Sequence, residues 1–126
     1  MTIKDVCEKF GITADTLRYY EKVGAIPKVA RSQGGIREYD DEALGWVQTA
    51  VCLRKAGVSV EAIVEYVRLF DMGDETLQAR LDLLSKEREA LGKQLDELTE
   101  AVNLLDRKIS RYMAAVETGV LSWDEE

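Results

Sequence analysis

The segment 13–24 contains three side chains suited to nucleic-acid recognition: Arg18, Tyr19 and Lys22. Arginine offers a rigid fork of donors, tyrosine a flat ring with a hydroxyl group, and lysine a mobile charge. In a helix their spacing places them on one face, while Leu17 and Tyr20 point toward a neighbouring helix. An exposed face of this composition can bind a phosphate or a base edge. The same pattern also fits a solvated face beside core tyrosines, so the neighbouring segments must decide between the two interpretations.

Charge is distributed unevenly along the chain. The net charge of −7 argues against a nucleic-acid partner, but residues 1–70 contain ten basic and ten acidic side chains, whereas residues 71–126 contain seven and fourteen. Between Arg18 and Arg37 there are five basic residues against one acid, Glu21. This local excess predicts a DNA-binding surface despite the acidic total.

Several classes of site are excluded by composition. The chain has no histidine, which rules out a histidine general base and a mixed Cys/His zinc site. Its two cysteines, Cys7 and Cys52, are not spaced as a metal knuckle, and Ser32 has no base to activate it. We therefore expect no enzymatic activity, no cofactor and no metal. No apolar run approaches the roughly 20 residues of a membrane span, and the amino-terminal residues do not show the charged-then-apolar pattern of an export signal, so we expect a cytoplasmic protein.

Two capping signals predict a helix-turn-helix at the start of the chain. Thr2 with Asp5 begins a helix that ends at Gly11, and Thr13 begins a second helix that ends at Gly24. In such a motif the second helix enters the major groove. The predicted DNA-contacting residues of this helix are Thr13, Thr16, Arg18, Tyr19 and Lys22.

The segment from Pro27 to Tyr39 predicts a wing. Short extended pieces flank Gln33-Gly34-Gly35, a sequence suited to a hairpin turn. Arg31 and Arg37 on such a wing would contact the DNA backbone or an adjacent groove. A surface hairpin without a DNA-binding role is the alternative.

Two further helices are predicted to cover the back of the helix-turn-helix. The first is capped by Asp40 or Asp41 and ends at Gly57, and the second is capped by Ser59. Their predicted core residues are Leu44, Val47, Ala50, Val51, Leu53, Ile63, Val67 and Phe70.

A heptad repeat occupies the last third of the chain. Alternate steps of four and three from Leu77 reach an apolar residue at every position to Val116 except Arg88. This period predicts a coiled coil of roughly 60 Å, too long to bury its apolar seam on a small domain, and its simplest partner is a second copy. Folding back onto its own domain is the alternative. The predicted dimerisation residues are Leu81, Leu84, Leu91, Leu95, Leu98, Val102, Leu105 and Ile109.

The predicted organisation is therefore mainly α. A winged helix-turn-helix domain (1–70), a linker (71–74) and a coiled-coil helix (75–118) precede an acidic tail (119–126).

With these elements in place, the sequence resembles the MerR family of bacterial transcription regulators. The resemblance rests on Thr16-Leu-Arg-Tyr-Tyr-Glu-Lys-Val-Gly24, Ile26-Pro27, Gly35-Ile-Arg37 and Tyr39. It implies DNA contacts at Arg18, Tyr19, Arg37 and Tyr39, and an antiparallel coiled coil between two protomers. It further implies binding to an inverted-repeat promoter with an overlong spacer, which the regulator distorts for RNA polymerase.

The chain departs from the metal-sensing members, because no cysteine follows Cys52. We also expect it to differ from the drug-sensing members in lacking their large carboxy-terminal ligand domain. The stretches 51–59, 65–70 and 73–76 are instead similar to a branch that responds to reactive carbonyls and nitrosative stress through one cysteine. That similarity points to Cys52 as a sensing residue, although a free cysteine is also a common core residue.

A protein-interaction adaptor with a structural helical head is the alternative function. The basic face distinguishes the two, since an adaptor has no need of five basic residues around one groove-sized surface.

Overall fold

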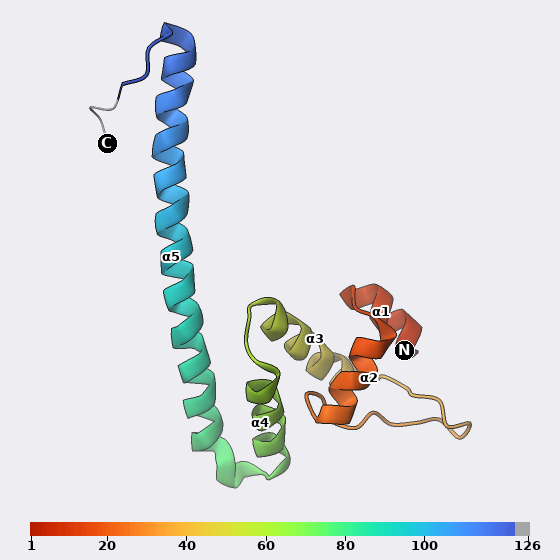
Figure 1. Ribbon diagram of the computed structural model, residues 1–126. Coiled ribbons are helices and arrows are strands. Elements are labelled where there is room, and N and C mark those ends of the chain that lie inside the picture. Colours follow the sequence, from red (N-terminus) through yellow and green to blue (C-terminus); the bar gives the residue numbers. More distant parts are fainter. Residues whose placement is uncertain (123–126) are drawn as a thin grey trace. The chain divides into compact units, whose positions relative to one another are not determined.

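The structure, a computed structural model, describes residues 1–122 and is mainly helical, as predicted (Figure 1). It divides into two compact units, the first spanning Met1–Glu87 and the second beginning at Arg88. The helices in chain order are α1 (Ile3–Phe10), α2 (Ala14–Val23), α3 (Asp41–Lys55), α4 (Val60–Asp71), the short 3₁₀ helix η1 (Asp74–Thr76) and α5 (Leu77–Thr118).

The first four helices begin where local capping chemistry predicts. The N-cap residues Thr2, Thr13, Asp40 and Ser59 each accept a hydrogen bond from the backbone N–H three residues further on. At α1 the bond is reciprocal, because the Asp5 carboxylate also accepts from the Thr2 N–H. These side chains satisfy donors that the first helical turn leaves unpaired.

The core of the first unit lies where α1, α2, α3 and α4 meet. Val6, Leu17 and Val47 are fully buried, and Ile63 is nearly so. Leu17 and Tyr20 point inward from α2, as their spacing predicts. The opposite face of α2 is thereby left to solvent.

The last turn of α4 differs from the prediction. Phe70 was expected in the core, but it is 44% exposed, and its neighbour Leu69 is buried instead. The Phe70 ring packs edge to face against Trp46, with ring centroids 4.9 Å apart, and the Arg80 guanidinium lies 5.4 Å from its centroid. Phe70 therefore lies at the edge of the core.

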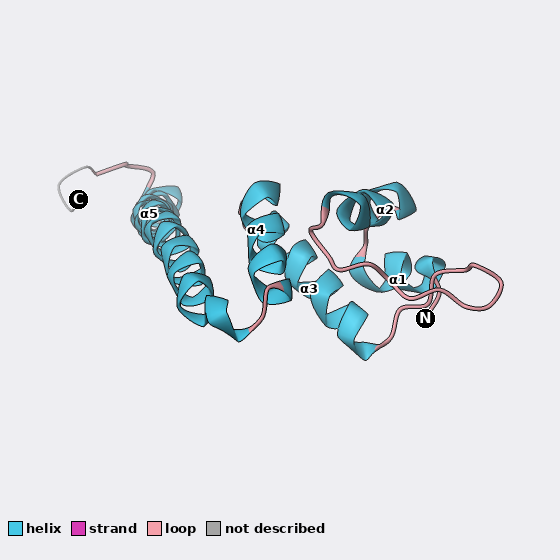
Figure 2. Ribbon diagram, turned by 90° about the horizontal axis from the view of Figure 1, so that it is seen from below, coloured by secondary structure: helices cyan, strands magenta, loops and turns pink. Residues whose placement is uncertain are grey.

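The wing, residues 27–39, is a hairpin held by few backbone bonds. Its only β-bridge in the described part of the chain joins Arg31 and Arg37, so the predicted extended pieces are shorter than strands. Ser32 N–H donates to the Ile36 carbonyl at 2.7 Å, and the turn closes through Gly35 at φ 78°. Figure 2 shows the wing as a pink loop that extends beyond the helices.

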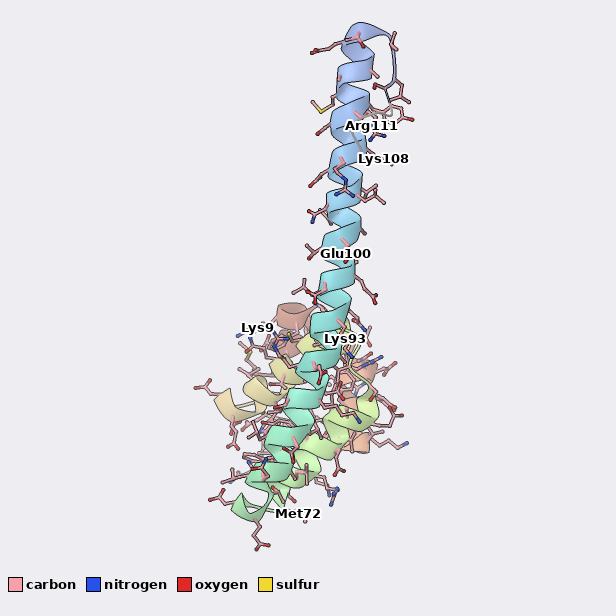
Figure 3. All side chains as sticks on the ribbon, turned by 90° about the vertical axis from the view of Figure 1, so that its left-hand side faces the viewer. Lys9, Met72, Lys93, Glu100, Lys108 and Arg111 are labelled. Carbon is pink, nitrogen blue, oxygen red and sulfur yellow. The ribbon has the colours of Figure 1, made fainter. Side chains whose placement is uncertain are left out.

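The segment after α4 begins with the turn Met72-Gly73 and η1, so α5 starts at Leu77 rather than at 75. α5 is 42 residues long and ends at Thr118; Gly119, which follows it, has φ 79°. None of its residues is buried, and Figure 3 shows side chains such as Lys93 and Glu100 projecting from it into solvent. Residues 123–126 of the predicted tail lie outside the described residues. No described helix is long and apolar enough to cross a membrane.

Candidate nucleic-acid interface

The exposed face of α2 begins with two threonines at its amino-terminal end. The Thr13 hydroxyl accepts the N–H of Thr16 at 3.1 Å and donates to the Thr16 hydroxyl at 2.9 Å. The free N–H groups and the dipole of a helix amino terminus favour an anion at this end. Both hydroxyls thus lie beside a natural position for a phosphate.

The next turn of α2 presents the larger side chains. Tyr19 is 48% exposed and Lys22 is exposed. Arg18 pairs with Asp15 at 3.1 Å, but the two side chains are 49% and 97% exposed. Such an exposed pair contributes little, so Arg18 can exchange Asp15 for a phosphate at small cost.

The wing contributes Arg31 and Arg37, whose environments differ. Arg31 is exposed, and its Nη1 donates to the carbonyl of Gly35 at 3.0 Å, which stiffens the turn. Arg37 is only 24% exposed, and its Nε donates to Oε1 of Glu21 at 2.7 Å. The structure therefore places Arg37 beside α2, held by a carboxylate.

Glu21 also accepts the N–H of Val29 through Oε2, at 2.8 Å. Burial raises the pKa of the Glu21 carboxyl. The hydrogen bonds from Val29 and Arg37, together with the charges of Arg37 and Arg31, outweigh burial, so its pKa lies below the ordinary value. Sequence reasoning missed this role, and the only signal was that Glu21 is the single acid among five basic residues.

Tyr39 corrects one expectation. It was predicted to contact DNA, but it is only 2% exposed, and its backbone pairs with that of Met1. Its hydroxyl is buried without a hydrogen-bond partner among the described residues. Burial, helped by the negative charge of Glu21, raises the pKa of the Tyr39 phenol. Tyr39 is thus a core residue at the base of the wing, and its side chain is not part of the exposed surface.

Cys52 is exposed on α3, and Cys7 is half-buried on α1; both are free thiols. The core position that was the alternative for Cys52 does not apply. Arg54 follows Cys52 by two residues, and its Nη1 donates to the Val58 carbonyl at 2.7 Å. Within residues 1–122 no group of three or more potential ligands gathers to bind a metal.

Residues 1–69 match the sequence model described as "MerR HTH family regulatory protein". The chain belongs to the MerR family. Among its MerR relatives, the transcriptional regulator AdhR of Bacillus subtilis is 50% identical over 91 residues, which are 72% of this chain and 65% of AdhR. An uncharacterized helix-turn-helix regulator of Haemophilus influenzae is 34% identical over 94% of this chain and 87% of its own length.

Solved MerR-family structures agree with the fold. A family regulator from Listeria monocytogenes superimposes with a TM-score of 0.88 at 40% identity, covering 94% of this chain and 90% of its own. HiNmlR, described as a MerR family regulator lacking the sensor domain and bound to promoter DNA, has a TM-score of 0.81 at 34% identity and covers 94% of each chain.

These MerR relatives are named as transcription regulators and not as enzymes or adaptors. The chain is therefore a transcription regulator of the MerR family, a family whose members bind promoter DNA.

Proposed function

We propose that this regulator acts as a homodimer that binds an inverted-repeat promoter through α2 and the wing, and distorts that promoter to control transcription by RNA polymerase. The observation that supports this most strongly is the DNA-bound neighbour, which matches 94% of each chain at 34% identity. The same helix-turn-helix here presents an exposed face of basic and aromatic side chains.

The proposed DNA-contacting residues have unequal environments. The half-buried Thr16 adds a hydroxyl near the amino-terminal end of α2. The other proposed contacts from α2 and the wing turn are exposed: Thr13, Arg18, Tyr19, Lys22 and Arg31. Arg37 would contribute its terminal nitrogens, because only its Nε is used by Glu21.

The proposed dimer rests on the apolar seam of α5. We define the seam as the residues reached by the heptad repeat: Leu77, Leu81, Leu84, Leu91, Leu95, Leu98, Val102, Leu105, Ile109, Tyr112 and Val116. Most are strongly exposed, for example Leu95 at 63% and Leu98 at 64%. Burying one leucine side chain contributes roughly 1.5–3 kcal/mol. Because the seam contains several leucines, pairing with the α5 helix of a second copy would sum many such contributions.

The proposed effector is a reactive electrophile, with the Cys52 thiol as its target. Support comes from the resemblance of the stretch 51–59 to the branch that responds to reactive carbonyls, and from the exposure of Cys52, which gives a reagent access. A covalent adduct on α3 would alter the surface of the helix that packs on α4.

The DNA that flanks the reading frame is first searched for an inverted repeat within a promoter. A gel-shift titration with that DNA then tests the binding proposal. Arg18→Ala should weaken binding by about 1–3 kcal/mol and reduce the dependence of affinity on salt. Arg68→Ala is the matched control, because Arg68 also forms an exposed pair, with Glu65, but lies on α4. Equal affinities of the parent and Arg18→Ala would contradict the assignment.

Distortion is tested on the same complexes. Permanganate reactivity of thymines in the spacer should rise when the protein binds the promoter, and should not rise on a fragment with only one half-site. If the protein binds the promoter and the permanganate reactivity of the spacer is unchanged, the proposed distortion of the promoter is contradicted.

A further inference from the structure

We propose that Glu21 is a positioning residue that fixes the wing relative to α2, and so sets the geometry of the two elements that contact DNA. This inference rests on the proposed function and names a residue that does not itself touch DNA.

Glu21 reaches both arms of the wing from one point on α2. Its Oε2 accepts the N–H of Val29, before the wing turn, at 2.8 Å, and its Oε1 accepts Nε of Arg37, after the turn, at 2.7 Å. The wing has few other bonds, since its two arms share a single bridge between Arg31 and Arg37. Within the described residues, the two arms are joined to each other only by the bonds of Glu38 N–H to the Ala30 carbonyl and of Ser32 N–H to the Ile36 carbonyl, and by the bonds of the turn between them. The Glu21 carboxylate therefore ties both arms of this short hairpin to α2.

The charge of Glu21 would otherwise be unfavourable here. DNA is a polyanion, and a carboxylate on a face that binds phosphate repels it and cancels one of the five local positive charges. A role in positioning explains an acid at this place, because a carboxylate can accept from a backbone N–H and a guanidinium at once.

Burial distinguishes this pair from the surface pairs. The side chains of Glu21 and Arg37 are 11% and 24% exposed, whereas those of Glu65 and Arg68 are 43% and 57% exposed. Exposed pairs are weak because water and salt screen them. The Glu21 pair is shielded and has a second anchor at Val29, so it holds the wing in one position.

The orientation of Arg37 follows from the same contact. With Nε bound to Glu21, its two terminal nitrogens make no hydrogen bond within the described residues. Glu21 thus directs the remaining donors of Arg37 in a fixed direction, which lowers the entropy lost when they meet a phosphate.

The test compares Glu21→Gln with Glu38→Gln in promoter binding. Both variants remove one negative charge near the wing, but Glu38 is exposed and its side chain has no ion-pair partner in the described part of the chain. Simple electrostatics predicts unchanged or tighter binding for both. Positioning predicts that Glu21→Gln instead loses roughly tenfold in affinity, as expected for a lost charged hydrogen bond, while Glu38→Gln does not.

A double-mutant cycle with Arg37→Ala locates the effect. If Glu21 acts through Arg37 and the wing, Glu21→Gln should cost clearly less in the Arg37→Ala background than in the parent. Equal or tighter binding of Glu21→Gln, or an undiminished loss in the Arg37→Ala background, would overturn the proposal.

A measurement without DNA separates this inference from the proposed function. Amide hydrogen exchange followed by NMR should show the Val29 N–H protected in the parent and exchanging at least tenfold faster in Glu21→Gln, with the amides of α1 unchanged. If Glu21→Gln does not fold, Glu21→Asp, which keeps the charge but is one methylene shorter, should show the same faster exchange. Unchanged exchange at Val29 would refute the positioning role even if the protein binds its promoter; failure of the parent to bind would refute only the proposed function.

Discussion

The hydroxyl of Thr76 donates to the carbonyl of Leu69 at 2.5 Å, joining the last turn of α4 to η1, directly before α5. The same hydroxyl lies 2.8 Å from the Gly73 carbonyl and accepts from Nε of Arg80 at 3.0 Å. Arg80 also donates to the Gly73 carbonyl at 2.9 Å. Thr76 is 7% exposed, so these bonds satisfy polar groups that water does not reach.

Thr76→Val should therefore destabilise the first unit. The change keeps the shape but leaves buried groups without partners, which costs about 1–3 kcal/mol. Urea unfolding measures this. Thr49→Val is the control, because the Thr49 hydroxyl makes a similar bond to the Gly45 carbonyl in an exposed part of α3. Equal urea midpoints for Thr76→Val and Thr49→Val would show that the hydrogen bonds of Thr76 contribute no more to stability than an exposed bond does.

Leu95→Glu with Leu98→Glu should dissociate the proposed dimer. The two carboxylates would take the place of leucines at consecutive positions of the seam. Burying a carboxylate in a helix interface costs much more free energy, through loss of hydration, than losing the leucine contacts alone. Sedimentation velocity at micromolar concentration would show the change. Leu104→Glu, 44% exposed and outside the seam, should leave the dimer intact. A parent protein that sediments as a monomer at this concentration would contradict the proposed dimer itself.

Cys52→Ser should abolish the response to an electrophilic aldehyde while leaving promoter binding intact. The thiol is exposed, so a reagent reaches it and serine fits without a cavity. Promoter output in cells, with and without the aldehyde, measures the response, and Cys7→Ser serves as the control. A Cys52→Ser variant that responds as the parent does would place the effector elsewhere.

Gly92→Ala should stabilise α5. Glycine inside a helix costs about 0.5–1 kcal/mol relative to alanine. The added methyl group would lie 2.6 Å from Nη1 of Arg88, the flexible end of a long side chain that moves aside readily. Thermal unfolding followed by circular dichroism should show a higher midpoint. Gly119→Ala should show none, since φ at Gly119 is 79°.

Acid should weaken the link between α2 and the wing. The folded-state pKa of Glu21 is lowered, so its contribution to stability is complete above the pKa of the unfolded chain. That contribution is lost as pH falls through the folded pKa. The stability difference between the parent and Glu21→Gln should therefore be largest near neutral pH and shrink in acid. A difference that stays constant between neutral pH and pH 3 would contradict this assignment.

Local chemistry made much of the fold predictable. Thr2, Thr13, Asp40 and Ser59 act on donors within one helical turn, so sequence spacing alone indicates where their helices begin. The inward direction of Leu17 follows equally from helical period.

What escaped prediction depends on contacts between distant residues. Glu21 bonds to Arg37 sixteen positions away, and the buried Tyr39 pairs through its backbone with Met1, 38 positions away. Neither has a signal in local spacing. Phe70 and Leu69 are adjacent and both apolar, so only the packing of α4 against its neighbours determines which one is buried.

The concentration of acidic residues in the second half of the chain affects how the protein approaches DNA. Residues 71–126 have a charge of 7 − 14 = −7, while residues 1–70 are neutral overall and have their positive charge clustered around α2 and the wing. The field of a duplex therefore repels α5 and its tail, and encounters through them are brief. Productive collisions are selected by orientation before any specific bond forms, and added salt, which shortens the range of the field to about 8 Å at physiological strength, weakens that selection.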